Sequence, residues 1–468
     1  SLLIRYFSHI NQKHFFYIPD RVQDGYGASK KLFQKLILRK PKLIIMVDCG
    51  STSNEAIEYL NQHNIKSIII DHHEINKPYP KSFAIINPKK KDTKNEKSFL
   101  CATALTYFFI DNLINITKSN FRLSNFLIYV LLATICDVMP LRKINKIIAH
   151  NTINDFKLKD NKALSYIFDQ FNLKKKISIN DLGFLIGPII NAGGRLNHSK
   201  YGVELLSTND QEIIKDRADK LIKLNNKRKK IEQDILDKID FPKIKTENKG
   251  VIIYYKDNLN EGLIGIIASR LKDYFDKPSI VITKSNNILK ASARSTYSYN
   301  IGYLIKSLID SNIIEKGGGH NMAAGFILKK ENIKLLDDFI QKDYLKKMSN
   351  INILNTYDME LSSSAIKNKF MNDINKLGPF GNFNLLPIFC IRNLKIIKFE
   401  VINNKHISVI IKPDAGASIK AICFNSLNTK VGYYLLSYKK KINIIAQIQE
   451  NIWNNKKTIQ LNIKDLIL

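Results

Sequence analysis

Cysteine is scarce in this chain, and its placement argues against disulfide and zinc chemistry. The 468 residues include five cysteines, an odd number, and no two of them form a Cys-x-x-Cys pair. Small disulfide-stapled folds and zinc ribbons need paired, closely spaced cysteines. We therefore interpret the five thiols as small hydrophobic side chains in a reducing cytosol, and we expect a cytoplasmic protein.

Long hydrophobic runs are also lacking. No stretch of eighteen apolar residues occurs, and no signal-peptide pattern stands near the start. Hydrophobic residues nevertheless make up 44% of the chain and aromatic residues 10%, which is typical of folded globular domains. We expect no membrane association, a monomer, and about two to four domains for a chain of this length.

Acidic residues are few relative to basic ones. Lysine and arginine number 73 against 42 aspartates and glutamates, which gives a formal net charge of +31. An excess of this size favours a polyanionic partner, because a basic surface supplies salt-dependent affinity for phosphates. A Lys-, Ile- and Asn-rich composition imposed by an AT-rich genome would account for part of the excess.

Strand-like and helical patterns alternate over the first part of the chain. Apolar runs at 15–18, 43–47 and 66–70 are separated by helical patterns, which predicts an α/β domain with a parallel sheet. A thin apolar stripe after residue 203 predicts one long polar helix, and short alternating strands after residue 350 suggest a small barrel. The expected parts are an α/β domain over 1–200, a long connecting helix over 201–241, a smaller α/β domain over 242–348, and an OB-like β-barrel over 349–468.

Candidate metal ligands stand at the ends of these predicted elements. Asp48 follows the run 43–47, Asp71-His72-His73 follows 66–70, and Asp137 ends an apolar helix that Pro140 stops. Ligands of open α/β sheets bind at the carboxyl ends of the strands, and a mixed imidazole and carboxylate set suits hydrolytic divalent ions. Asp48 or Asp137 alone is better explained as a helix cap or a loop polar group, and the His72-His73 pair is explained equally well in either way, but the combination favours a metal site.

Several basic residues follow segments rich in glycine or other small residues. They are Arg195, Arg294 and His320. Glycine lets a backbone approach a phosphate closely, and arginine can donate two hydrogen bonds to the same phosphate. The Gly317–Gly319 run is either a phosphate cradle or a tight turn, and Arg21 is either a crevice residue or an exposed surface arginine. In the C-terminal part, aromatic residues interleaved with lysines suit the stacking of unpaired bases.

These motifs resemble a known family. Val47-Asp48-Cys49-Gly50, Asp71-His72-His73 and the segment 133–141 are similar to motifs two, three and four of the DHH phosphoesterases. With Asn191-Ala192-Gly193-Gly194-Arg195-Leu196, the segment 262–271 and the Gly-Gly-Gly-His run, the whole chain resembles the RecJ family of single-strand-specific 5′-to-3′ DNA exonucleases. The resemblance implies a DHH domain, a smaller DHHA1 domain and a terminal OB domain.

The resemblance also implies a mechanism and a set of roles. Two divalent ions, Mn²⁺ or Mg²⁺, would drive hydrolysis that releases 5′-mononucleotides in DNA repair and recombination. Single-stranded DNA would be the substrate, and a single-strand-binding protein and a helicase are candidate protein partners. The implied roles are: Asp48 bridging both ions, His72 and Asp137 holding the second one, Asp71 orienting the histidines, His73 and His320 at the scissile phosphate, Asn191 and Arg195 on the nucleic-acid backbone, and Arg21, Ser292 and Arg294 at the 5′-terminal phosphate.

The chain departs from the family pattern at two places. Asn260 stands near the position where the family usually has a histidine, and the Asp-rich first motif is missing, since Ser1 aligns just downstream of it. We therefore expect a truncated or split reading frame, or a decaying gene. Two alternatives stay open: a catalytically impaired DNA-binding remnant, and an oligonucleotide or cyclic-dinucleotide phosphodiesterase of the same superfamily, against which the OB-like part and the connecting helix argue.

Overall fold

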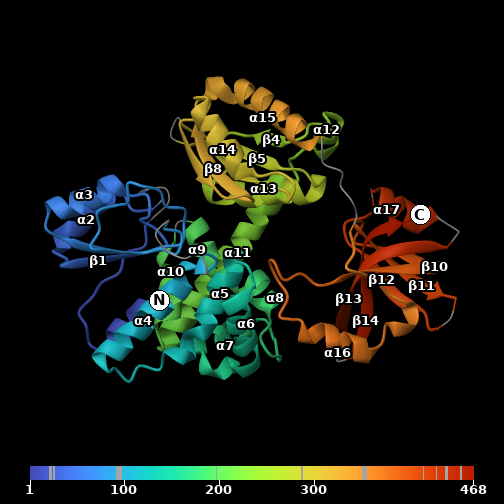
Figure 1. The fold of residues 1–468 in the computed structure, drawn as a ribbon, viewed down its shortest axis with the longest axis horizontal. Coiled ribbons are helices and arrows are strands. Elements are labelled where there is room, and N and C mark those ends of the chain that lie inside the picture. The colour runs from blue at the N-terminus through green and yellow to red at the C-terminus, as the bar shows by residue number, and fades with distance from the viewer. Residues whose placement is uncertain are drawn as a thin grey trace. The chain divides into compact units, whose positions relative to one another are not determined.

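A computed structural model describes residues 1–19, 24, 27–90, 97–196, 198–285, 288–349, 356–414, 416–427, 429–437, 441–453 and 456–467. The chain divides into two compact units, of which the first comprises Ser1–Asp137 and Phe156–Asn352 and the second Val138–Asp155 and Ile353–Leu468 (Figure 1). None of the helices within these described ranges is long and apolar enough to span a membrane.

The first unit contains a three-stranded parallel sheet in the order β1-β2-β3. Its strands are β1 (Leu43–Val47), β2 (Lys66–Ile70) and β3 (Ala84–Ile86). Val47 lies opposite Ile70, and Ile70 opposite Ile86, so that all three strands end at the same edge. The predicted parallel α/β sheet is confirmed, whereas the expected strand at 15–18 is wrong, because those residues pair with no strand among the described residues.

Helices cover this sheet through a continuous apolar cluster. On α2 (Lys30–Leu36) and α3 (Asn54–Gln62), buried side chains of Leu32, Ile57 and Leu60 pack with Met46 and Ile69 of the strands. The helix α4 (Ala102–Thr117) contacts β1 and β2. The first unit also contains α1 (Leu2–His9), α5 (Leu127–Cys136), α7 (Lys162–Gln170), α8 (Ile179–Asp181) and α9 (Gly187–Arg195).

The expected single helix over 201–241 is instead interrupted. The structure has α10 (Lys200–Ser207), α11 (Gln211–Leu236) and α12 (Phe241–Thr246). Asp210 starts α11 by accepting hydrogen bonds from the N–H groups of Glu212 and Ile213, which is why the helical pattern breaks before it. Pro lies in the first turn of α12, where its missing N–H costs no hydrogen bond.

A second sheet of the first unit is mixed and has the order β4-β5-β6-β8-β7. Only β4 and β5 are parallel. The apolar run of β5 is buried on both faces, since Ile280 and Ile282 pack into one cluster and Val281 into another. The elements are β4 (Ile252–Tyr255), α13 (Glu261–Phe275), β5 (Ser279–Ser285), β6 (Ile288–Arg294), α14 (Ile301–Asp310), β7 (Lys316–Gly319), β8 (Ala323–Leu328) and α15 (Ile333–Met348).

The second unit is built on a closed barrel. Around it the strands follow one another as β10, β11, β12, β14 and β13, and β13 pairs with β10 again. This confirms the predicted OB-like barrel. The elements are α6 (Lys143–Asp155), β9 (Met359–Glu360), α16 (Asn368–Lys376), β10 (Ile388–Ile402), β11 (His406–Pro413), β12 (Ile419–Cys423), α17 (Lys430–Ser437), β13 (Ile442–Trp453) and β14 (Lys456–Ile467).

One segment lies in a different part of the structure from the one expected. Residues Val138–Asp155, which the sequence placed within a single domain over 1–200, belong to the barrel unit. The Leu141 N–H donates to the carbonyl oxygen of Asn382 at 2.8 Å, a contact across more than two hundred residues. Local patterns carry no information about such a pairing, so the segment was assigned by its position in the chain alone.

Candidate metal and phosphate site

The ends of β1 and β2 bring the first two candidate ligands together. Asp48 follows β1, and its N–H donates to the carbonyl oxygen of Ile70 at 2.9 Å, which joins the two strand ends. Asp48 has a positive φ of 62°, a conformation that Asp adopts more readily than most residues. His72 Nε2 lies 3.2 Å from Asp48 Oδ1. The strand ends therefore aim a carboxylate and an imidazole at the same point.

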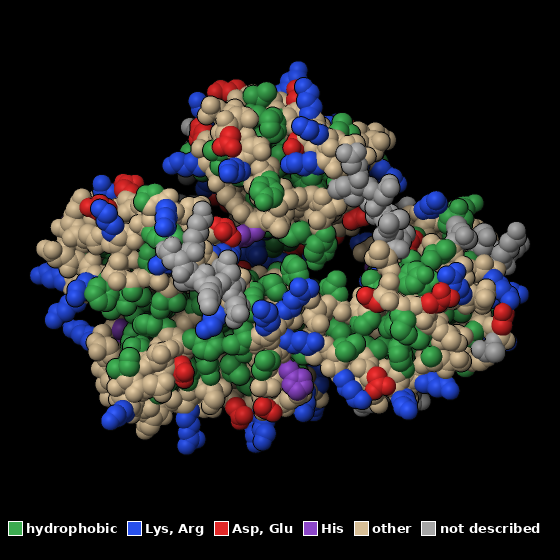
Figure 2. Space-filling model, viewed as in Figure 1, with side chains coloured by type: hydrophobic (Ala, Val, Ile, Leu, Met, Phe, Trp, Pro, Cys, Tyr) green, Lys and Arg blue, Asp and Glu red, His purple; other side chains and the backbone are tan. Residues whose placement is uncertain are grey.

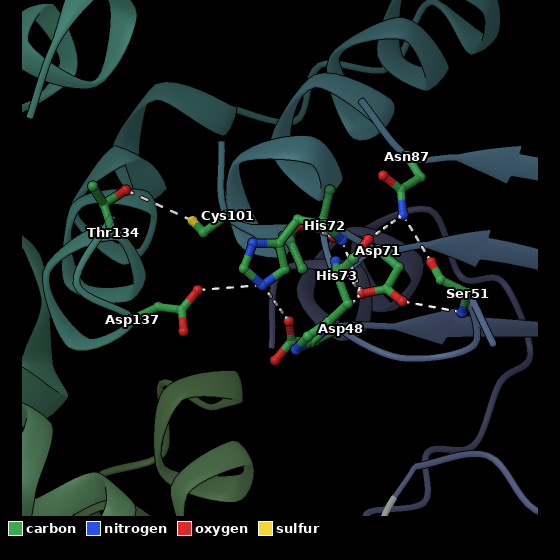
Figure 3. Close-up of polar contacts among 11 residues, drawn as sticks. Asp48, Ser51, Asp71, His72, His73, Asn87, Cys101, Thr134 and Asp137 are labelled. Atoms are coloured by element: carbon green, nitrogen blue, oxygen red, sulfur yellow. Dashed lines mark hydrogen bonds and ion pairs between the residues drawn. The ribbon is translucent and has the colours of Figure 1, made fainter. Parts of the chain in front are cut away.

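Asp137 reaches the same imidazole from a helix. It is the C-cap of α5, and its Oδ2 lies 3.2 Å from His72 Nε2 (Figure 3). The His72 side chain is 7% exposed, against 64% for Asp48 and 50% for Asp137. The His72 Nδ1 is buried and has no hydrogen-bond partner in the described part of the chain, so the polar contacts of its ring are on the Nε2 side.

Asp71 accepts hydrogen bonds from the main chain next to these candidate ligands. Its Oδ1 accepts from the N–H groups of His72 at 2.8 Å and His73 at 3.3 Å and from Nδ1 of His73 at 2.7 Å, while its Oδ2 accepts from the Ser51 N–H at 3.1 Å. Burial alone would raise the pKa of Asp71, but the hydrogen bonds from His73 and Ser51 outweigh it and hold the pKa well below its usual range. Asp71 is therefore an ionised carboxylate that orients both histidines.

Asn87 and Ser51 are site residues that the sequence reasoning missed. Asn87 follows β3 and donates through Nδ2 to Ser51 Oγ at 2.8 Å and to the carbonyl oxygen of His73 at 2.9 Å. Both residues are buried. The signal for Asn87 was the same as for Asp48, a polar residue directly after an apolar strand, but β3 has only three residues and was not predicted.

The electrostatics of the cluster favour a cation. Burial raises the pKa of Asp137, His72 opposes the rise, and the neighbouring charge of Asp48 adds to it. Burial raises the pKa of the two flanking thiols, that of Cys49 to about 12 and that of Cys136 to about 11, so that neither carries a negative charge at neutral pH. Two carboxylates and one imidazole that converge in this way are the donors that Mn²⁺ and related hydrolytic ions prefer, so the donor set fits a divalent ion.

His73 and His320 form a second pair beside the cluster. Their rings stack with centroids 6.1 Å apart and an interplanar angle of 20°. The hydrogen bond to Asp71 raises the pKa of His73, whereas burial and then the charge of Lys89 lower the pKa of His320. The pair therefore combines one imidazole that keeps its proton more readily with one that loses it more readily. Lys89 is a further residue near the site that the sequence analysis did not single out.

Ser292 and Arg294 lie together on β6, next to Gly265 of α13. Arg294 donates to Ser292 Oγ at 3.2 Å and to the carbonyl oxygen of Ala293 at 2.8 Å. A Cβ at Gly265 would lie 2.8 Å from Arg294 Nη2, so the glycine allows the helix to approach. Burial lowers the pKa of Arg294, and no carboxylate among the described residues pairs with it. A half-buried guanidinium of this kind suits an anion.

Two of the remaining predicted residues lie on α9. Arg195 ends α9 and donates through Nη1 to the carbonyl oxygen of Gly262 at 2.9 Å, which ties α9 to the start of α13. Asn191 lies on the exposed side of α9. Asn260 is the N-cap of α13 and accepts from the Gly262 N–H at 2.9 Å. Arg21 lies outside the described residues.

Comparisons with known proteins assign the parts of the chain. Residues 1–135 match the DHH family N-terminal domain, residues 248–346 the DHHA1 domain, and residues 357–465 the RecJ OB domain. The chain is 28% identical to the single-stranded-DNA-specific exonuclease RecJ of Haemophilus influenzae over 95% of its own length and 80% of that protein. It is also 28% identical to RecJ of Bacillus subtilis, covering 96% of this chain and 57% of the relative.

A solved structure has the same fold. The structure of RecJ in complex with Mn²⁺ from Thermus thermophilus superposes with a TM-score of 0.79 at 19% identity, over 100% of this chain and 66% of that one. The chain thus spans about two thirds of the length of this solved relative. Three successive family models and relatives that match nearly the whole sequence agree, and the chain therefore belongs to the RecJ family of DHH proteins.

Proposed function

We propose that this chain is a single-stranded DNA exonuclease that degrades its substrate from the 5′ end and releases 5′-mononucleotides, in DNA repair and recombination. The observation that carries the proposal is the convergence of Asp48 and Asp137 on Nε2 of His72, each at 3.2 Å, from three separate elements. The relatives named as single-stranded-DNA-specific exonucleases support the choice of substrate.

Asp48, His72 and Asp137 would hold a divalent ion, Mn²⁺ or Mg²⁺, and Asp48 would share a second one. Bound divalent ions supply Lewis-acid polarisation of a phosphoryl oxygen and a water nucleophile at neutral pH. The chain itself orients the donors, because Asp71 fixes the main chain of His72 and His73, and Asn87 fixes the carbonyl oxygen of His73. Such supporting contacts commonly change metal affinity tenfold or more.

His73 and His320 would act on the phosphodiester itself. Because Nδ1 of His73 is engaged with Asp71, Nε2 is the atom of that ring that can donate a proton to the leaving oxygen. The raised pKa of His73 favours the protonated ring that this role needs. His320, stacked on His73 and near Lys89, would contact the scissile phosphate.

Arg294 and Ser292 would bind the terminal 5′-phosphate, together with Arg21. The support is the half-buried guanidinium and the room that Gly265 leaves beside it. Arg195 and Asn191 would contact the strand further along, with Arg195 also holding the start of α13 in place.

The barrel unit would hold the distal part of the strand. Lysine and arginine side chains are spread over the visible face of the molecule, and acidic side chains are fewer (Figure 2). Exposed aromatic side chains of Phe399, Phe424 and Tyr433 in the barrel unit offer surfaces on which bases can stack. We further propose a monomer that works in the cytoplasm with a single-strand-binding protein and a helicase.

A nuclease assay tests this proposal. The chain is incubated with a 5′-phosphorylated single strand and Mn²⁺, and we expect mononucleotides, no product after chelation by EDTA, and weaker strand binding at higher salt. Asp137→Ala should abolish cleavage and leave strand binding within about twofold, while the exposed Asp216→Ala control should cleave normally. Binding without cleavage by the unaltered chain would instead identify a DNA-binding remnant, and preferred hydrolysis of dinucleotides or cyclic dinucleotides would identify a small-substrate phosphodiesterase.

A further inference from the structure

The chain passes from one unit to the other directly after Asp137. The Asp137 N–H closes the last turn of α5 by donating to the carbonyl oxygen of Ala133 at 2.9 Å, and Val138 is the first residue of the barrel unit. Val138 has a positive φ of 54° although it is β-branched. Glycine usually occupies this position after a helix, since a Cβ is unfavourable there. A valine keeps such a conformation only where its surroundings hold it.

A turn of the barrel unit, Phe380 to Asn384, provides that hold. The N–H of Leu141 donates to the carbonyl oxygen of Asn382 at 2.8 Å, and Nδ2 of Asn382 donates to the carbonyl oxygen of Val138. The turn itself is closed by main-chain hydrogen bonds in both directions between Gly381 and Asn384. The side chain of Asn382 is therefore hydrogen-bonded to Val138, and its main-chain carbonyl oxygen is hydrogen-bonded to Leu141, three residues later.

Further contacts hold the segment after Asp137 in place. Arg142 donates through Nε to the carbonyl oxygen of Phe383 at 3.0 Å, and its guanidinium lies 5.3 Å from the centroid of the Phe383 ring. A Cβ at Gly381 would lie 2.6 Å from Leu141 Cδ1, so the turn approaches the segment as closely as a glycine allows. On the other side, Asn145 donates through Nδ2 to the carbonyl oxygen of Pro140 at 3.0 Å.

We propose that this turn positions Asp137 for metal binding and that Asn382 is the positioning residue. The proposal rests on the proposed function, in which Asp137 is a metal ligand one peptide away from the gripped segment. Metal sites need ligand atoms within a few tenths of an ångström of their ideal distances. A release of Val138 from its left-handed conformation would rotate the peptide that follows Asp137 and move its carboxylate.

Mn²⁺ binding by isothermal titration calorimetry tests the proposal with one variant and two controls. We expect Asn382→Ala to weaken Mn²⁺ binding about tenfold, as the loss of an orienting contact does. Leu385→Ala, an exposed residue next to the turn, should stay within about twofold. Adding Val138→Gly to Asn382→Ala should restore the affinity to within about threefold, because glycine adopts a positive φ without help.

Hydrogen–deuterium exchange of the peptide over 133–142 gives a readout that does not depend on metal. Asn382→Ala should speed exchange at Leu141, whose N–H donates to the main chain of the turn, and leave α5 protected. Unchanged Mn²⁺ affinity in Asn382→Ala, or a loss that Val138→Gly does not restore, would overturn the positioning role. If the unaltered chain binds no Mn²⁺, the proposed metal function fails. Unchanged exchange in Asn382→Ala would show separately that Asn382 does not hold the segment after Asp137 in place.

Discussion

Replacing Asp71 with asparagine removes a buried charge without changing the shape of the side chain. The Asp71 side chain is 1% exposed, and its two oxygens accept four hydrogen bonds, three at Oδ1 and one at Oδ2. An amide has one acceptor oxygen, so asparagine can serve the three donors of His72 and His73 only by turning its NH₂ group toward the Ser51 N–H. The substitution therefore leaves one buried N–H without an acceptor.

The magnitude follows from these contacts. An orphaned buried donor costs about 1–3 kcal/mol, and the charge-assisted bond from His73 weakens by about 1 kcal/mol when its acceptor becomes neutral. The uncharged amide is easier to bury than a carboxylate, which offsets part of the loss. We expect Asp71→Asn to lower the free energy of unfolding of the first unit by about 2 kcal/mol. Metal affinity should fall up to about tenfold, since the hydrogen bonds that orient the two histidines then end on a neutral oxygen and weaken.

Urea denaturation followed by far-UV circular dichroism measures the effect. The single tryptophan, Trp453, belongs to the second unit and would not report on the first. Asp216→Asn is the matched control, because the pKa of Asp216 is also lowered, by its hydrogen bond with Lys220, but the side chain is exposed. Equal unfolding curves for the two variants would show that the buried Asp71 carboxylate does not stabilise the first unit.

The same substitution has a pH signature. The folded pKa of Asp71 is depressed below its unfolded value of about 3.9, so its contribution to stability is present above that pH and is lost as the pH falls toward the folded pKa. The unaltered chain should therefore lose stability progressively as the pH falls below about 4, and part of this acid slope should be missing in Asp71→Asn. An identical slope in both chains would show that the carboxylate is not held ionised.

Three further predictions concern other parts of the first unit. Gly265→Ala would place a methyl group 2.8 Å from Arg294 Nη2, so it should weaken binding of 5′-phosphorylated strands and leave 5′-hydroxyl strands unaffected in a competition assay. Tyr299→Phe removes the hydrogen bond of a buried hydroxyl to a carboxylate on α15, and urea denaturation should show a loss of about 1–2 kcal/mol. Lys89→Met removes a charge that lowers the pKa of His320, so an NMR titration should show a higher pKa for His320 in this variant. An unchanged pKa would show that the charge of Lys89 does not act on His320.

Residues at strand ends were predictable from the sequence because the signal is local. An apolar run followed by a carboxylate or histidine identifies both the strand and the edge where it ends, and Asp48 and His72 were found in this way. The residues around 15–18 show the limit of the same signal. A run of aromatic residues suits a strand, but a strand also needs a neighbour with free main-chain groups. Phe15, Phe16 and Tyr17 are exposed, and residues 15–18 belong to no strand of the described structure.

The sequence alone was enough to predict the class of the fold and the family, and to propose which side chains bind a divalent ion or a phosphate. The three-dimensional structure was needed to show that Asn87 is hydrogen-bonded to His73 and Ser51 to Asp71, and that Asn382 is hydrogen-bonded to the segment after Asp137. The physical reason is that hydrophobic periodicity and residue chemistry act over a few neighbouring positions. Hydrogen bonds between groups more than two hundred residues apart depend on how the chain closes in three dimensions.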